Sequence, residues 1–279
     1  MANKIFRDYT YKTSIYFLNI IVLLYMIGPF IYMIFASLYD KRSFWTWPPK
    51  WPNEITISAY EWIFKYTNFT TYYINSLFVA FLSMIINLLI SSLAGYGLSR
   101  FKWRFNDLIM KIIIFTYIFP FFGLIIPIFR LFYNLGLYDS LFGLSVLYAI
   151  FNMPFNIIIL SGFFQMFPKE IEEAAKVDGA SNIMTFLKIV MPNVVPGLIT
   201  AALFHYIWCW GEYYFAAILI SKDALRTLPP ALYSLMRGET VFYRELLAAA
   251  SMVAFPALII TLLTQKFLIK GLTAGAIKG

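Results

Sequence analysis

Cysteine and histidine are nearly absent from the sequence, and this limits the chemistry that the chain can carry. The one cysteine, Cys209, lies in an apolar run, so a disulfide framework and a cysteine metal site are excluded. The one histidine, His205, has no second histidine or cysteine at the spacing of metal ligands. The sequence also lacks the G-x-x-x-x-G-K-[ST] loop that binds ATP phosphates, and it lacks the G-x-S-x-G and H-E-x-x-H motifs of hydrolases. We therefore predict no catalytic residue, no metal and no cofactor in this chain.

Charged residues are also scarce. Only 13% of the residues are charged and 61% are hydrophobic, with a mean hydropathy of +0.73. Soluble domains have roughly 45–50% apolar and about 25% charged residues, so the composition indicates a membrane protein. The net charge of +8 comes without a block of like charges and without the basic–aromatic alternation that suits nucleic acid, so we predict no nucleic-acid partner. Basic residues that flank membrane spans explain the excess.

Long uncharged windows recur along the chain. A membrane-spanning helix needs about 20 apolar residues, and six windows can supply one: Thr13–Tyr39, Tyr66–Ser99, Ile112–Phe129, Ser140–Pro168, Ile189–Gly211 (continuing past Glu212 to Ser221) and Leu246–Gln265. We predict an all-α integral membrane protein with six transmembrane helices in contact with lipid. The first window is too long for a cleaved signal peptide and no small-residue cleavage site follows it, so we expect it to be retained. No internal repeat or linker suggests a second domain, and residues 1–279 are predicted to form a single transmembrane domain.

The distribution of lysine and arginine predicts the orientation. With the N-terminus inside, 13 of the 22 basic residues fall in connections on the cytoplasmic side. The compact R-F-K-W-R cluster at residues 100–104 decides this bias, because cytoplasmic loops are enriched in lysine and arginine. We therefore expect a multi-pass protein with both termini in the cytoplasm.

Residues 170–192 are the most charged, helix-favouring interval, and they lie between two apolar windows. Glu172–Lys176 are strong helix formers, and Gly179 then interrupts the pattern. Four apolar residues follow at spacings of i, i+3, i+4 and i+7, which predicts a second helix with one apolar face: Ile183, Phe186, Leu187 and Val190. Pro192 is expected to end this helix. The pattern predicts a short helix–turn–helix at the membrane surface that a soluble partner can grip; a solvated interhelical loop is the alternative.

This interval resembles the E-A-A loop of ABC importer permeases. The pattern of that loop (E-A-A, three residues, G, nine residues, I, one residue, L-P) is matched except at Met191, where leucine is usual. The fuller E-A-A-K-V-D-G-A form resembles the carbohydrate-uptake branch. The resemblance implies that residues 165–193, between the fourth and fifth spans, form a cytoplasmic coupling-helix loop. It further implies that seven residues couple this loop to a partner ATPase: Glu173, Ala174, Ala175, Asp178, Gly179, Ala180 and Pro192.

The C-terminal segment resembles the end of the second, smaller permease subunit of the maltose type. Residues 267–279 read F-L-I-K-G-L-T-A-G-A-I-K-G, and the family usually ends in G-L-T-A-G-x-x-K-G. In that family the tail inserts between the two ATPase subunits. The resemblance therefore implies ATPase contacts for five residues: Gly271, Thr273, Gly275, Lys278 and Gly279.

Polar residues within the predicted spans are candidates for a solute pathway, because polar groups in lipid are costly and usually face the bundle interior or a cavity. The candidates lie on the second, fourth and fifth spans: Asn87, Asn152, Asn156, Tyr206, Trp208 and Glu212. For the asparagines the alternative is an interhelical hydrogen bond. Glu212 is the only acid within a span, and its setting W-G-E-Y-Y resembles the W-N-E-F segment of carbohydrate permeases, with Gly211 in place of asparagine. For Glu212 the alternative is an anchor at a helix end.

The resemblance covers nearly the whole chain and implies a permease subunit of an ATP-driven ABC importer for a di- or oligosaccharide, located in a bacterial or archaeal cell membrane. The implied partners are a homologous second permease chain, two ATPase subunits that bind ATP and Mg, and an external sugar-binding protein. One alternative is an importer permease for a non-sugar solute. Others are an integral-membrane enzyme that uses Glu212 and His205 as an acid–base pair, and a passive channel. Neither an enzyme nor a channel needs a docking loop or a glycine-rich tail.

Overall fold

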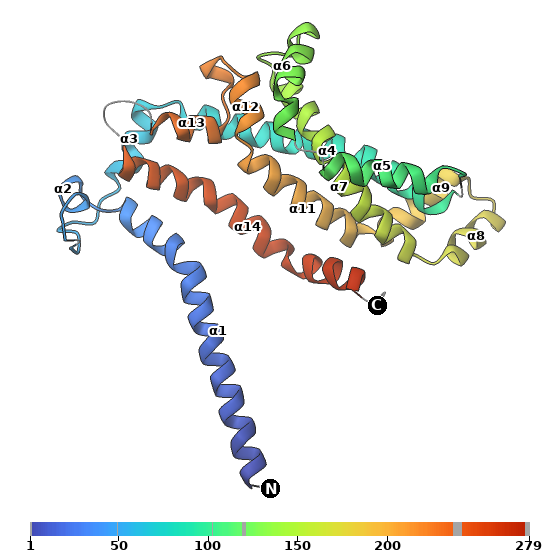
Figure 1. Cartoon of the computed structure of the whole chain (residues 1–279), viewed down its shortest axis with the longest axis horizontal. Helices are drawn as coiled ribbons and strands as arrows, with labels where there is room; N and C mark the ends of the chain where they lie inside the picture. The colour runs from blue at the N-terminus through green and yellow to red at the C-terminus, as the bar shows by residue number, and fades with distance from the viewer. Residues whose placement is uncertain (1, 49, 102, 119–120, 237–241, 277–279) are drawn as a thin grey trace. The chain divides into compact units, whose positions relative to one another are not determined.

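The computed structural model describes residues 2–48, 50–101, 103–118, 121–236 and 242–276. Within these ranges the chain consists of helices and connecting segments, without a β-strand, and the predicted all-α fold is confirmed (Figure 1). The elements are α1 (Ala2–Ser37), α2 (Lys41–Phe44), α3 (Ser58–Tyr66), α4 (Phe69–Arg100), α5 (Asn106–Ile118), η1 (Phe121–Leu124), α6 (Ile125–Asn134), α7 (Leu141–Met166), α8 (Lys169–Val177), α9 (Asn182–Thr185), η2 (Phe186–Val190), α10 (Met191–Asn193), α11 (Val195–Gly211), α12 (Tyr214–Leu219), η3 (Asp223–Leu225), α13 (Leu228–Ser234) and α14 (Tyr243–Ala276).

The long apolar helices coincide with the uncharged windows of the sequence. Four helical segments are each long and apolar enough to cross a membrane: Tyr11–Ser37, Phe69–Arg100, Leu141–Met166 and Tyr243–Gln265. Two bent helix pairs bring the number of spans to the predicted six if each pair is counted as one span: Asn106–Ile118 with Phe122–Asn134, and Asn182–Asn193 with Val195–Gly211. The second pair is bent by 75°. The bend separates the short helices that follow Gly179 from the spanning helix α11.

The chain divides into two compact units. Unit 1 comprises residues 1–67 and 232–255, and unit 2 comprises residues 68–231 and 256–279. In unit 1, a buried ion pair between Arg244 and Glu245 (2.8 Å) stands at the start of α14. The Arg244 guanidinium also donates to the Tyr39 carbonyl and to Ser58 Oγ. The start of α14 is thereby connected, within this unit, to the residues that follow α1 and to the start of α3.

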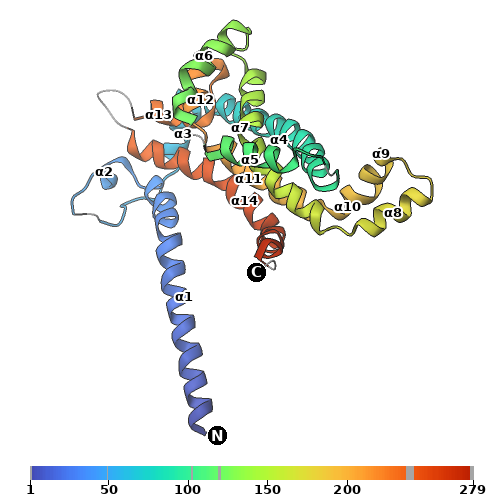
Figure 2. The same ribbon diagram turned by 45° about the vertical axis from the view of Figure 1, so that its right-hand side comes forward.

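Unit 2 contains the helices that surround the E-A-A segment. Within it, α4, α7 and α11 lie side by side, and α8 and α9 lie at one end of these three helices (Figure 1, Figure 2). Helices α4 and α7 approach closely at Gly95, where an added Cβ would lie 3.0 Å from the backbone nitrogen of Ser161. A larger residue at this position would force the two helices apart.

An apolar core lies near the α8 end of this bundle. Its buried members come from α4, α7 and the chain around α11: Tyr96, Leu160, Phe164, Phe186, Val190, Val194 and Ala201. Because burial of apolar surface is the main favourable term in packing, this core fixes the residues that follow the E-A-A segment against α4 and α7.

Two details of the predicted second helix differ from the structure. Pro192 does not end it: Pro192 lies near the start of α10, which runs to Asn193 after a π-helical turn at Phe186–Val190. Proline is tolerated in the first turn of a helix, where its missing N–H has no partner to lose. The predicted single apolar face is also split, because Phe186 and Val190 are buried whereas Ile183 and Leu187 are 73% and 57% exposed.

The C-terminal segment is helical as far as it is described. Helix α14 continues through Gly271, Thr273 and Gly275 to Ala276. Lys278 and Gly279, which the sequence also predicts to be contact residues, lie outside the described residues.

Candidate functional site

The candidate site is the helical hairpin of α8 and α9. Local sequence signals determine its first helix and its turn. Glu170 and Glu172 lie in the first turn of α8 and Lys176 in its last turn, so their charges complement the helix dipole. The chain then turns at Gly179, which has φ +90°, a conformation that favours glycine. The turn is closed by two hydrogen bonds, from Gly179 N to Lys176 O and from Ala180 N to Ala175 O, the pattern of a Schellman motif. The predicted turn at Gly179 is confirmed.

The two faces of α8 differ. Glu173, Ala174, Lys176 and Asp178 are exposed, whereas Glu172 and Ala175 are buried. Ser181 Oγ accepts the Met184 N–H at the start of α9, which satisfies one of the free donors of that short helix. The hairpin therefore exposes charged side chains together with apolar ones, such as Val177 (88% exposed), on one side, and it attaches to the bundle on the other.

The attachment is a buried ion pair that the sequence analysis missed. Glu172 Oε1 accepts from Arg100 Nε at 2.6 Å, and the two side chains are only 5% and 7% exposed. Glu172 Oε2 accepts from the Tyr96 hydroxyl at 2.8 Å. Arg100 also donates to the Phe167 carbonyl, 2.8 Å away. We refer to Tyr96, Arg100 and Glu172 as the latch.

The aromatic ring of Tyr96 extends the latch into the apolar core. It packs against Phe164 of α7 and Phe186 of η2, with ring centroids 5.5 and 4.7 Å apart. Tyr96 thus contacts α8 through its hydroxyl and η2 through its ring. One residue of α4 therefore contacts both α8 and η2, the segment that follows α9.

The sequence does carry a signal for the latch. Arg100 is the first charge after the second apolar window, and Glu172 lies three residues before the apolar Ala175 on the same helix. Residues three apart share a helix face, so Glu172 is predicted to face inward with Ala175, and a buried carboxylate requires a partner. The pattern alone does not identify that partner.

The three asparagines among the pathway candidates lie in a buried network. Asn156 donates to Asn87 Oδ1, and Asn87 donates to the Ala149 carbonyl at 2.8 Å. Asn152 lies 3.3 Å from His205 Nδ1, and Nε2 of this ring lies 3.0 Å from Ser83 Oγ and 3.2 Å from Cys209 Sγ. These contacts join α4, α7 and α11. They support interhelical hydrogen bonds at Asn87, Asn152 and Asn156 rather than an open pathway surface.

The other pathway candidates lie on or directly after α11. Tyr206 is buried and stacks on Trp210 at a centroid distance of 5.4 Å. Trp208 is half-buried and meets the edge of Tyr148. Glu212 follows the last residue of α11 and accepts the N–H groups of Phe215 and Ala216 at 3.0 and 3.2 Å. The Tyr148 hydroxyl also donates to Glu212. These contacts support the alternative of a helix-end anchor for Glu212.

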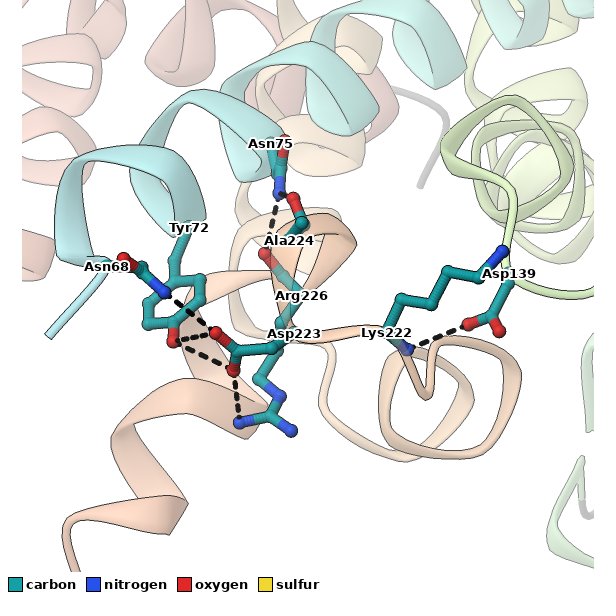
Figure 3. Close-up of polar contacts among 8 residues, drawn as sticks. All are labelled: Asn68, Tyr72, Asn75, Asp139, Lys222, Asp223, Ala224 and Arg226. Atoms are coloured by element: carbon teal, nitrogen blue, oxygen red, sulfur yellow. Dashed lines mark hydrogen bonds and ion pairs between the residues drawn. The ribbon is translucent and has the colours of Figure 1, made fainter.

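A second polar cluster lies at the other end of α4 (Figure 3). Asp223 accepts from Asn68 Nδ2 and from the Tyr72 hydroxyl, each at 2.9 Å, and pairs with Arg226 at 2.9 Å. Asn75 Nδ2 donates to the carbonyls of Ala224 and Arg226. The hydrogen bond from Asn68 is the main cause that lowers the pKa of Asp223 below its usual value.

The same segment is also held from the start of α7. Asp139, in the left-handed region with φ 53°, accepts the N–H groups of Ser221 and Lys222 at 2.6 and 3.0 Å. Ser221 Oγ donates to the second oxygen of Asp139. We refer to Asn68, Tyr72, Asn75 and Asp139, together with their acceptor Asp223, as the clamp. It holds the segment of residues 221–228, to which Asp223 itself belongs, through many hydrogen bonds, most of them partly exposed.

The described residues contain no group of three or more His, Cys, Asp or Glu side chains that could hold a metal ion.

Residues 87–273 match the family of binding-protein-dependent transport system inner membrane components. The chain belongs to this family. The chain is 33% identical to the sulfoquinovosyl glycerol transport system permease protein SmoH of Agrobacterium fabrum, over 90% of this chain and 88% of that protein. It is 32% identical to the trehalose/maltose transport system permease protein MalG of Thermococcus litoralis, over 90% and 91%.

A solved structure agrees with the family. The chain matches a chain of a bacterial ABC transporter involved in the import of the acidic polysaccharide alginate, with a TM-score of 0.78, 26% identity and coverage of 93% and 96%. The resemblance read from the E-A-A segment and the C-terminal segment is thereby confirmed. The protein is a membrane-embedded ABC importer permease, and the latch and the α8–α9 hairpin both lie within the matched residues.

Proposed function

We propose that this permease imports a di- or oligosaccharide with energy from ATP. The α8–α9 hairpin carries the proposal, because it exposes charged and apolar side chains while its other face is fixed to the spanning helices. The sugar class is supported by relatives named for trehalose/maltose and for a sulfoquinovosyl glycerol, and by the similar alginate importer.

In this proposal the hairpin and both termini face the cytoplasm, and the chain works with four partners. Two ATPase subunits bind ATP and Mg and hydrolyse the nucleotide. A homologous second permease chain completes the transmembrane pathway, and an external binding protein delivers the sugar. ATP binding and hydrolysis then drive the permease pair between inward-open and outward-open states.

The hairpin residues divide their roles according to exposure. Glu173, Ala174 and Asp178 would touch the ATPase, whereas buried Ala175 would seat α8 on the bundle. Gly179 and Ala180 make the turn, and Pro192 keeps its place at the start of α10. A charge-assisted contact of Glu173 with a basic ATPase residue would contribute about 1.5–3 kcal/mol. The tail would also contact the ATPase subunits, through Gly271, Thr273, Gly275, Lys278 and Gly279.

Among the pathway candidates, Trp208 remains the strongest, since it is the one whose side chain is partly exposed. The other candidates are buried and would support the wall of the solute pathway from within the helix bundle: Asn87, Asn152, Asn156, Tyr206 and Glu212. An acid–base pair of Glu212 and His205, which an enzyme would need, is disfavoured because each side chain bonds to other partners.

The proposal is tested by uptake into liposomes that contain this chain, the second permease and the two ATPases, with the binding protein outside. We expect uptake of a labelled di- or oligosaccharide only when ATP is present. Gly179→Asp should reduce uptake about tenfold or more, because a left-handed non-glycine residue costs roughly 1–2 kcal/mol and 1.4 kcal/mol is a factor of ten.

Gly136→Asp is the matched control. Gly136 also has positive φ (+69°) and open space around its Cα, but it lies in the connection between α6 and α7. The control should keep most of the uptake. Undiminished uptake by Gly179→Asp would contradict the coupling role, and ATP-driven uptake of other solutes but no sugar would contradict the sugar assignment.

A further inference from the structure

We infer that the latch is a positioning device, in which Arg100 and Glu172 transmit movement of the α8–α9 hairpin to α4 and α7. The inference rests on the proposed function, since it assumes that an ATPase displaces the hairpin. It assigns the transmission to two residues that lie outside the exposed docking surface. Arg100 and Glu172 would act through α8 and would touch neither solute nor nucleotide.

The first argument is the position of Arg100. It is the last residue of α4, and its guanidinium reaches two other elements. One nitrogen donates to Glu172 of α8, and another donates to the carbonyl of Phe167, the residue that follows α7. One planar cation therefore ties the ends of two spanning helices to the hairpin. The fork of an arginine holds such partners in a fixed geometry.

The second argument is the short connection between α7 and α8. Only Phe167 and Pro168 separate the two helices, and the ring of Pro168 restricts its own backbone. α8 is thus fixed covalently to α7 and by the ion pair to α4. A displacement of α8 would therefore move the ends of both α4 and α7.

The third argument is that α8 depends on this one polar attachment. Among the described residues, no α8 side chain other than Glu172 makes a hydrogen bond or an ion pair. The exposed charges of α8 point to solvent, where the partner would bind. Docking and attachment therefore use different side chains of one short helix, which allows each to be changed alone.

The fourth argument is the burial of the pair. Both side chains are almost fully enclosed, and the third guanidinium nitrogen, Nη1, is buried without a hydrogen-bond partner. A buried pair of this kind is weak as a source of stability compared with apolar packing, but breaking it leaves an uncompensated charge. The pair therefore resists sliding or separation of α8 and α4, as a transmitting contact requires.

The test uses the complete transporter in liposomes, with sugar uptake and ATP hydrolysis measured on the same sample. Glu172→Gln keeps the shape and loses the charge, and Arg100→Gln loses the fork. In both variants we expect uptake per hydrolysed ATP to fall about tenfold or more, while the ATPases still copurify with the permease. The double variant R100E/E172R should recover a large part of the ratio, because it restores opposite charges.

Two further variants separate transmission from folding. Glu61→Gln removes the same charge from an exposed position on α3, outside the hairpin, and it should leave the ratio unchanged. Tyr96→Phe keeps the ring in the apolar core and removes only the hydroxyl, so its ratio should fall less than that of Glu172→Gln.

Three results would overturn the inference. The first is an unchanged ratio in Glu172→Gln. The second is a parallel fall of uptake and hydrolysis together with loss of the ATPases from the purified complex, which indicates a merely structural role. The third is a charge-reversed pair that recovers nothing. Failure of the proposed function gives a different result, because the wild-type complex itself would then show no ATP-driven sugar uptake.

Discussion

The two ends of α4 are held in opposite ways. At its last residue, Arg100 forms one buried ion pair with α8. At its start, Asn68, Tyr72 and Asn75 hold residues 221–228 through hydrogen bonds that are partly exposed, several of them to backbone groups. The latch concentrates its attachment in one charged contact, whereas the clamp spreads its attachment over many weak ones.

This difference has a physical consequence. A hydrogen bond contributes about 0.5–1.5 kcal/mol, and a segment held by several of them tolerates the loss of any one. Removal of one partner of a buried pair costs about 3–5 kcal/mol, because the other charge stays buried without compensation. The attachment of residues 221–228 should therefore survive the loss of a single contact, whereas the attachment of α8 should be lost when its one ion pair is broken.

Matched arginine substitutions give the largest expected effect. Arg100→Ala should lower the stability of the detergent-solubilised protein by about 3–5 kcal/mol, because Glu172 loses its counter-charge. Arg226→Ala removes a partner of Asp223 in a pair whose side chains are 29% and 47% exposed, and it should cost about 0–1 kcal/mol. Thermal unfolding of both variants measures the difference. Equal losses would show that burial of the Arg100–Glu172 pair adds nothing beyond what the exposed Arg226–Asp223 pair contributes.

The sequence predicts the spans and the hairpin well, because both depend on local patterns. Uncharged windows predict the spans, and the sequence around Gly179 predicts the turn through glycine's tolerance of positive φ. The latch was missed because it joins residues 72 positions apart, and a single sequence contains no signal for which arginine meets which glutamate.

The errors in the second helix have a similar origin. Spacing predicts one apolar face at Ile183, Phe186, Leu187 and Val190, but a π-helical turn has more residues per turn than an α-helix, so the face changes. The position of Tyr96 favours Phe186 and Val190 as the buried pair. Tertiary packing, which periodicity does not contain, decided between them.

A smaller effect is expected from Trp208 on α11 and Asn152 on α7. Trp208→Ala should change the rate of sugar uptake more than the choice of sugar, because its side chain is only half-buried against Tyr148.

Asn152→Ala, at a buried neighbour of His205, should mainly lower stability, by about 1–3 kcal/mol from the unpaired polar group that it leaves. Uptake by liposomes with a panel of sugars measures both. A switch in sugar preference by either variant would show that this chain holds the sugar directly.

The smallest effect concerns the response of the clamp to acid. The pKa of Asp223 is lowered, first by the hydrogen bond from Asn68 and then by those from Tyr72 and the charge of Arg226. A carboxyl group with a lower pKa in the folded state adds stability above its unfolded pKa of about 3.9, and this is lost as the pH falls through the folded pKa. Asp223→Asn should therefore be slightly less stable than the wild type at pH 7, and the difference should be smaller at pH 3. Thermal unfolding at the two pH values measures it, and a difference that stays constant would mean that the charge of Asp223 does not hold residues 221–228.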